Sequence, residues 1–290
     1  MTAWGLGRLD ATDRRSSGRS VPVSVWIAAG WLLLLFLLGL LAAVITPENA
    51  LTSDLRARLL PPVLFGGNFE HVLGTDQLGR DMLARILLSI KTSMLVAFLG
   101  TIIGAIIGTS LGMIAAACRG IVDDFIMMLV DVQAALPFII VAMAVVAFFG
   151  GNFWLFVAVV GLFGWERYAR IARGVTLAAR EEPYVAAVRH IGGGTFRIYA
   201  LHILPNVSSA LIVAFTLNFP ETLLLETTLS FLGLGVRPPN TSLGTMLGEG
   251  RDYLVNAWWI AVVPGLVIAF ASLAATVIGD WLRDALDSRS

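Results

Sequence analysis

The chain has 290 residues, of which 57% are hydrophobic and only 14% are charged, and its mean hydropathy is +0.83. Soluble domains carry about 25% charged residues, so this composition excludes a soluble protein and indicates an integral membrane protein. The formal net charge is zero, which gives no reason to expect a nucleic-acid partner, and the single cysteine, Cys118, excludes an intrachain disulfide.

Long apolar runs predict an all-α integral membrane fold with about six transmembrane helices. A helix needs about 20 apolar residues to cross a bilayer core of about 30 Å, and the runs lack the alternation of a barrel. The expected spans are 25–45, 93–117, 125–149, 154–165, 206–234 and 258–281. The first follows a basic tail and could be a cleavable signal peptide, but its length favours a retained span.

Small residues and prolines mark the second and third spans. Glycines recur at every fourth position in the second span, which predicts one face for close helix packing; they are Gly100, Gly104, Gly108 and Gly112. In the third span Pro137 should produce a kink. Asp131 in the same span should face protein or water, either pairing helices or lining a translocation path.

The fifth span is unusual because it contains Pro220, Glu221 and Glu226. Positions five apart differ by about 140° around a helix, so the two carboxylates should face different surroundings. Each is either held by a neighbouring helix or part of a translocation path. Glu221 is the better path candidate.

Segment 180–206 is a polar island between apolar runs. Pro183 can open a short helix and Gly192 can close it. Thr195 is then a suitable cap for a second helix, 196–204, that ends before Pro205. From these residues alone the segment is either an ordinary connector or a docking element for a partner.

Two motifs resemble those of a known family. The first is an external-loop signature before the second span, similar to the GTDxxGRD of dipeptide, oligopeptide and nickel ABC permeases; it comprises Gly74, Thr75, Asp76, Gly79, Arg80 and Asp81. The second lies in segment 180–206 and resembles the cytoplasmic loop through which binding-protein-dependent ABC importers contact their ATPases. Its candidate contact residues are Glu182, Tyr184, Ala186, Ala187, Arg189, His190, Gly192, Phe196 and Arg197.

One position departs from the second motif, because Ala186 stands where the family has glutamate. Either that ion pair is dispensable, or Glu181 or Glu182 supplies the carboxylate. Glu226 with segment 230–235 also matches the family pattern, whereas Glu221 does not.

The resemblance implies a type I, MetI-like permease with a cytoplasmic coupling helix, in the inner membrane of a bacterium. It implies four kinds of partner: a second, homologous permease subunit, two cytoplasmic ATPases, an extracytoplasmic solute-binding protein and the lipid bilayer. Independently, Lys91 is the only lysine and no Walker A loop precedes it, so ATP and Mg²⁺ would be bound by partner subunits and this chain needs no cofactor.

Arginines set the expected orientation. Short loops on the side of segment 180–206 carry most of them, which places that segment and both termini in the cytoplasm. The expected organisation is a cytoplasmic tail 1–22, a first span 23–45, an external loop 46–88, a permease core 89–286 and a tail 287–290.

Two other function classes are considered. An ion-driven secondary transporter could use Asp131, Glu221 and Glu226 as a proton relay. An intramembrane enzyme is rejected because all three histidines lie outside the expected spans, so no catalytic or metal-binding residue is predicted.

Overall fold

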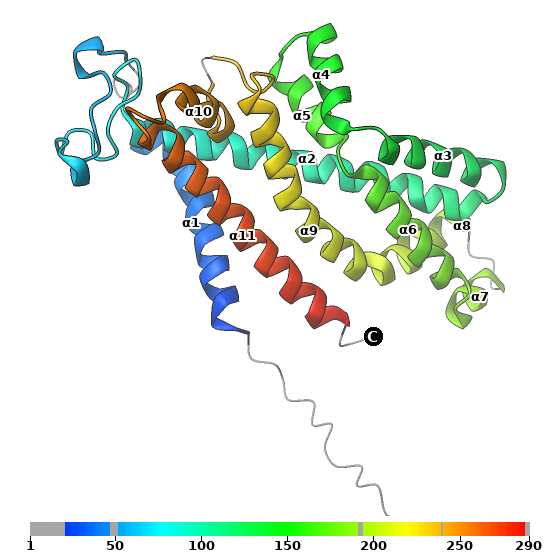
Figure 1. Ribbon diagram of the computed structural model, residues 1–290. Helices are drawn as coiled ribbons and strands as arrows, with labels where there is room; N and C mark the ends of the chain where they lie inside the picture. The colour runs from blue at the N-terminus through cyan, green and yellow to red at the C-terminus, as the bar shows by residue number, and fades with distance from the viewer. Residues whose placement is uncertain (1–20, 47–51, 191–193, 239, 288–290) are drawn as a thin grey trace, which may run out of the picture.

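The computed structural model describes residues 21–46, 52–190, 194–238 and 240–287, and in these ranges it contains helices but no extended strand. Its body consists of 4 helices long and apolar enough to cross a membrane: α1 (Val23–Ile45), α2 (Met82–Cys118), α9 (Leu204–Phe231) and α11 (Trp259–Asp287). α1, α11 and α9 lie side by side in that order, and α1 and α9 both contact α2 (Figure 1).

The predicted third span, 125–149, is two helices. α3 (Ile121–Ala135) and α4 (Phe138–Phe149) meet at a bend of 92°. Pro137 lies at the break, as the sequence predicts, because it has no N–H and disfavours a helical conformation at the preceding residue. Leu136 accordingly adopts an extended backbone, with φ −89° and ψ 134°. The kink is confirmed, but a single continuous helix is wrong.

The predicted fourth span is also interrupted. α5 (Phe153–Gly161) has only 9 residues, or about 14 Å, and α6 (Trp165–Arg180) begins after Gly164, whose φ is +75°. α6 is too polar to be counted as a span. Among the described residues, length and composition therefore give 4 spans, or 5 if α3 and α4 cross as one, where the sequence predicted about six.

The glycine row of α2 packs against the chain from the end of α5 into α6, which confirms its predicted packing role. A Cβ added at Gly108 would lie 2.1 Å from the carbonyl oxygen of Trp165, and one at Gly112 would lie 2.3 Å from that of Ala169. The glycines therefore let the backbones of α2 and α6 approach more closely than any side chain would allow.

At the end where α2 begins, the structure corrects two loop boundaries. α2 starts at Met82, inside the expected loop 46–88, because the Asp81 side chain caps it by accepting a hydrogen bond from the Ala84 N–H at 2.8 Å. The expected loop 236–257 contains helix α10 (Leu243–Gly250), which starts with a capping box formed by Ser242 and Thr245. Short 3-10 turns at Leu55–Ala57, Val63–Phe65 and Arg251–Tyr253 complete this end.

The main hydrophobic core lies where α1, α2, α9, α10 and α11 meet. Its fully buried members include Met82, Leu223 and Ile260. Because α10 contributes Leu243 and Met246 to this core, it is an integral part of the body and not a surface loop.

At the opposite end lie α7 (Pro183–His190), α8 (Thr195–Ile198), the described end of α11 and the start of α1 (Figure 1). Pro183 opens α7 as predicted. The predicted helix 196–204 does not stop at Pro205, however, because α8 continues through a π-helical turn (Tyr199–Ile203) into α9. Pro205 sits in the first turn of α9, where its missing N–H costs no hydrogen bond.

Candidate functional sites

The external-loop signature folds around the carboxylate of Asp76, which is completely buried. One oxygen, Oδ1, accepts the backbone N–H groups of Leu78 and Arg80 at 2.8 and 2.9 Å. The other, Oδ2, accepts Nε of Arg80 and Nη1 of Arg85, both at 2.7 Å. Two guanidinium groups and two amides thus compensate the desolvation of this buried anion.

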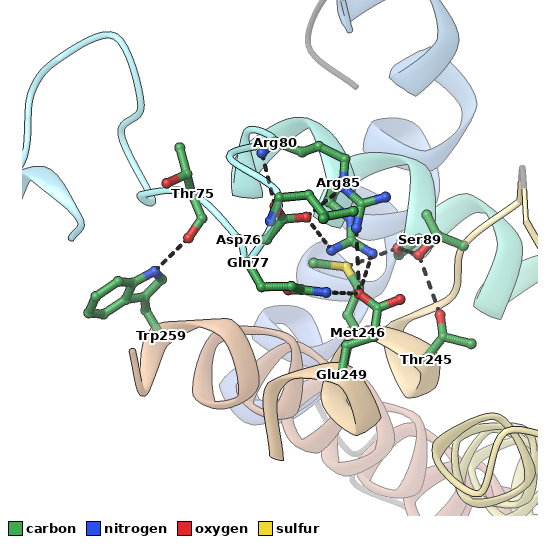
Figure 2. A network of polar contacts seen from close by, with 12 residues as sticks. Thr75, Asp76, Gln77, Arg80, Arg85, Ser89, Thr245, Met246, Glu249 and Trp259 are labelled. Carbon is green, nitrogen blue, oxygen red and sulfur yellow. Dashed lines mark hydrogen bonds and ion pairs between the residues drawn. The ribbon is translucent and has the colours of Figure 1, made fainter. Parts of the chain in front are cut away.

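Arg85 connects the signature to α10. It is only 2% exposed, and its second nitrogen, Nη2, donates to Oε2 of Glu249 at 2.9 Å. The Gln77 amide donates to the same oxygen at 3.1 Å, and Nη2 of Arg80 lies 3.7 Å from it. We call Asp76, Gln77, Arg80, Arg85 and Glu249 the Asp76 cluster; Figure 2 shows these side chains converging from the signature loop, α2 and α10.

The other signature residues shape the loop. Gly74 and Gly79 have φ of +78° and +75°, and a Cβ at Gly79 would lie 1.7 Å from the carbonyl oxygen of Asp54. Thr75 is buried and its hydroxyl accepts the Leu60 N–H at 2.8 Å. Asp81 caps α2 and also lies 3.1 Å from Nδ1 of His71. The signature therefore builds a rigid loop, with Asp76 at its centre.

Segment 180–206 has one buried face and one exposed face. Val185 of α7 is fully buried and packs in one cluster with Ile198, Tyr199, Ile203 and Val207, which belong to α8, the π turn and α9. The side chains on the other face are exposed: Glu182, Tyr184, Ala187, His190 and Arg197. The structure also places Nδ2 of Asn206 3.2 Å from the Tyr184 hydroxyl.

Several predicted contact residues are not placed in this way. Gly192 lies outside the described residues, and the side chains of Ala186, Arg189 and Phe196 do as well. Glu181 is 3.3 Å from Arg119 at the end of α2, so it pairs within this chain. Of the two acidic residues suggested as substitutes for the missing glutamate, Glu182 is exposed, and its side chain forms no ion pair with any of the residues that the structure describes.

The three predicted path carboxylates lie in different surroundings. Glu221 is 44% exposed and forms an ion pair of 2.8 Å with Arg167 of α6. Asp131 is 73% exposed and lies 3.1 Å from Arg170 of α6. Glu226 is completely buried, and its Oε1 accepts the Ser230 hydroxyl at 2.7 Å. The different environments expected for Glu221 and Glu226 are therefore confirmed, and Glu221 and Asp131 each contact a neighbouring helix.

The sequence analysis missed the most tightly bonded pair between helices. Nε and Nη2 of Arg173 each donate to Asp123 of α3 at 2.6 Å. This bidentate hydrogen bond raises the pKa of Arg173 above its usual value, so the pair stays ionised. No local spacing in the sequence signals this pair, because Asp123 lies 50 residues before Arg173.

Among the residues that the structure describes, no group of three or more histidine, cysteine, aspartate or glutamate side chains could hold a metal ion. The two ends of the molecule instead present a rigid, charge-compensated loop and an amphipathic helical hairpin, joined by long apolar helices.

Residues 108–290, more than half of the chain, match the family described as "Binding-protein-dependent transport system inner membrane component". The chain belongs to this family. It is a transmembrane permease subunit of a binding-protein-dependent ABC importer of the bacterial inner membrane, and the alternative of an ion-driven secondary transporter is thereby set aside.

Relatives of this permease cover most of its length. The di/tripeptide transport system permease protein of Pseudomonas aeruginosa is 37% identical over 260 residues, covering 89% of this chain and 86% of the relative. The dipeptide permease of Escherichia coli is 37% identical over 263 residues, covering 89% and 87%. A glutathione transport system permease of Pectobacterium atrosepticum is 36% identical over 224 residues, covering 77% and 74%.

The fold is that of a solved ABC transporter. The inward-facing MetNI methionine transporter superposes with a TM-score of 0.56 at 17% identity, covering 70% of this permease and 97% of that chain. This likeness confirms the predicted type I, MetI-like fold.

Proposed function

We propose that this permease forms one half of an ATP-driven import pathway for short peptides, with a second, homologous permease subunit forming the other half. The support for the substrate is that the relatives described above are named as dipeptide, di/tripeptide and glutathione permeases. In this proposal an extracytoplasmic binding protein delivers the peptide and two separate ATPase subunits supply the energy.

The main support for coupling to the ATPase is that α7 has one buried face and one exposed face. Its buried Val185 fixes the helix to α8, the π turn and α9, while its exposed face is free to contact a partner. A displacement of α7 by the partner would therefore also displace the membrane-spanning helix α9. We assign the contact with the ATPase to the exposed face and to the predicted residues beside it that the structure does not place.

We assign the translocation path to the face of α9 that carries Glu221. A half-exposed ion pair on a membrane-spanning helix is costly against lipid tails, so Arg167 and Glu221 should face water or a partner subunit. Asp131 and Glu226 remain candidates for the path because they are acidic residues within the expected spans. The arginine-rich end around α6 supports the proposal that α7 faces the cytoplasm and that the Asp76 cluster faces outward.

Cysteine cross-linking tests the proposal. Cys118 is exposed and is the chain's only cysteine, so it is first replaced by serine. In that background Ala187→Cys on α7 should form a disulfide with a cysteine placed on the ATPase surface, and the yield should change when ATP is added. The matched control is Asp252→Cys, which is exposed at the opposite end of the molecule and should form no such cross-link.

Two results would contradict the proposal. One is a cross-link from position 252 but none from position 187. The other is peptide uptake into vesicles that contain this permease without any ATPase subunit.

A further inference from the structure

A polar cavity of about 550 Å³ lies beside the Asp76 cluster, between α2, α10 and the segment that precedes α10. Ligand pockets commonly have volumes of about 300–1,000 Å³. One wall is a single face of α2, on which Arg85, Leu88 and Thr92 follow at helical spacing. The opposite wall carries Thr245 and Glu249, one turn apart on α10.

The two ends of this cavity differ in charge. At one end the two carboxylates of the Asp76 cluster are matched by its two arginines. The side chain of Glu249 is nevertheless 37% exposed, so its carboxylate can accept a further donor from the cavity. This end is suited to a small cationic group such as an ammonium.

The other end carries an unmatched positive charge. Lys91 lines the cavity and is exposed, and its side chain has no hydrogen bond or ion pair among the residues that the structure describes. It lies on α2, a candidate membrane-spanning helix, where an isolated ammonium is costly unless it is in contact with water. Because Lys91 lines the cavity and is exposed, its ammonium is available to an anion there.

We infer that this cavity receives the free termini of a short peptide, with the carboxylate at Lys91 and the ammonium at Glu249. This inference rests on the proposed peptide substrate and adds the residues that would bind it. Lys91 and Arg85, the arginine that bonds Glu249, are about 9 Å apart along the axis of α2, which is the scale of a short peptide. An extended dipeptide spans about 7 Å and a tripeptide about 10 Å.

The single lysine of this chain supplies a direct assay. The complete transporter, in neutral phosphatidylcholine nanodiscs and without its binding protein, is briefly treated with an amine-acylating reagent, and acylation of Lys91 is measured by mass spectrometry. Dialanine should slow this acylation about fivefold or more. Dialanine amide is the control, because its amine reacts with the reagent as that of dialanine does. It keeps the ammonium but lacks the carboxylate, so it should not protect Lys91 from acylation.

Uptake measurements provide a second test of the role of Lys91. At limiting concentrations of loaded binding protein, Lys91→Gln should reduce dialanine uptake about fivefold, since a partly exposed ion pair contributes up to about a factor of five. Lys91→Arg should restore it. Arg251→Gln is the matched control, because Arg251 is exposed at the same end and pairs only with its neighbour Asp252.

The outcomes separate this inference from the function on which it rests. Equal acylation with and without dialanine, equal protection by the amide, or protection by the binding protein alone would overturn the inference while peptide transport stands. Wild-type uptake by Lys91→Gln would do the same. If the wild-type transporter imports no dialanine or other short peptide, the proposed substrate itself is wrong.

Discussion

Gly108→Ala tests whether close backbone contact between α2 and α6 holds this permease together. A Cβ at position 108 would lie 2.1 Å from the Trp165 carbonyl oxygen and 2.6 Å from the Cβ of Tyr168. A normal carbon–oxygen contact is about 3.3 Å, so the helices would have to separate locally by about 1.2 Å. The obstructing atoms are a backbone carbonyl oxygen and a Cβ, and no change of rotamer can move either of them.

The expected loss of stability follows from this geometry. Overpacking a close-packed interior by one methyl group costs about 1–3 kcal/mol, and the rigid backbone contact favours the upper part of that range. Alanine is a better helix former than glycine by about 1 kcal/mol, which offsets part of the loss. We therefore expect a net destabilisation of about 1–2 kcal/mol.

The assay is thermal unfolding of the detergent-solubilised complex, followed by the fraction that remains monodisperse after heating. The matched control is Gly174→Ala in α6, where a Cβ would meet no atom within 4 Å. This control should melt at or slightly above the wild-type temperature because it gains helix propensity without a clash. The reasoning is refuted if Gly108→Ala melts with wild type, or if Gly174→Ala is the more destabilised variant.

Two further predictions concern ion pairs. Arg173→Ala leaves the largely buried Asp123 without its bidentate partner and should cost about 2 kcal/mol in the same unfolding assay. The control Arg251→Ala removes one partner of an exposed pair and should cost less than about 0.5 kcal/mol. Equal losses of stability in the two variants would contradict the argument from burial. Arg85→Met leaves the buried Asp76 with one guanidinium and should cost about 3 kcal/mol. This change removes the arginine that bonds both Asp76 of the signature loop and Glu249 of α10, and so loosens the loop. A protease added to the outer face of spheroplasts should therefore cleave the loop faster than in wild type, and an unchanged cleavage rate would be evidence against that role.

Much of the fold follows from local signals. Apolar length alone identifies α1, α2, α9 and α11, since a helix is the structure in which one segment satisfies its own backbone hydrogen bonds in lipid. Pro183 and Pro137 mark real helix boundaries because proline acts on its own backbone and on the preceding residue. Family motifs identify both ends of the molecule before any contact is known.

Other features could not be read from local signals. The 92° bend depends on the packing around Pro137, because a proline requires a break but does not set its angle. The start of α10 is marked in the sequence by the capping box of Ser242 and Thr245. The interpretation of 236–257 as a loop did not take this local signal into account. Pro205 shows the opposite case, since a preceding π turn allows a helix to pass through an apparent stop.

The sequence by itself determined that the protein is a helical membrane permease, because hydropathy and short motifs are properties of neighbouring residues. Tertiary structure alone decided which charges meet: Asp76 with Arg85 and Glu249, Asp123 with Arg173, and Glu221 with Arg167. The physical reason is that an ion pair between helices depends on their relative rotation and depth, which packing sets along the whole length of the chain.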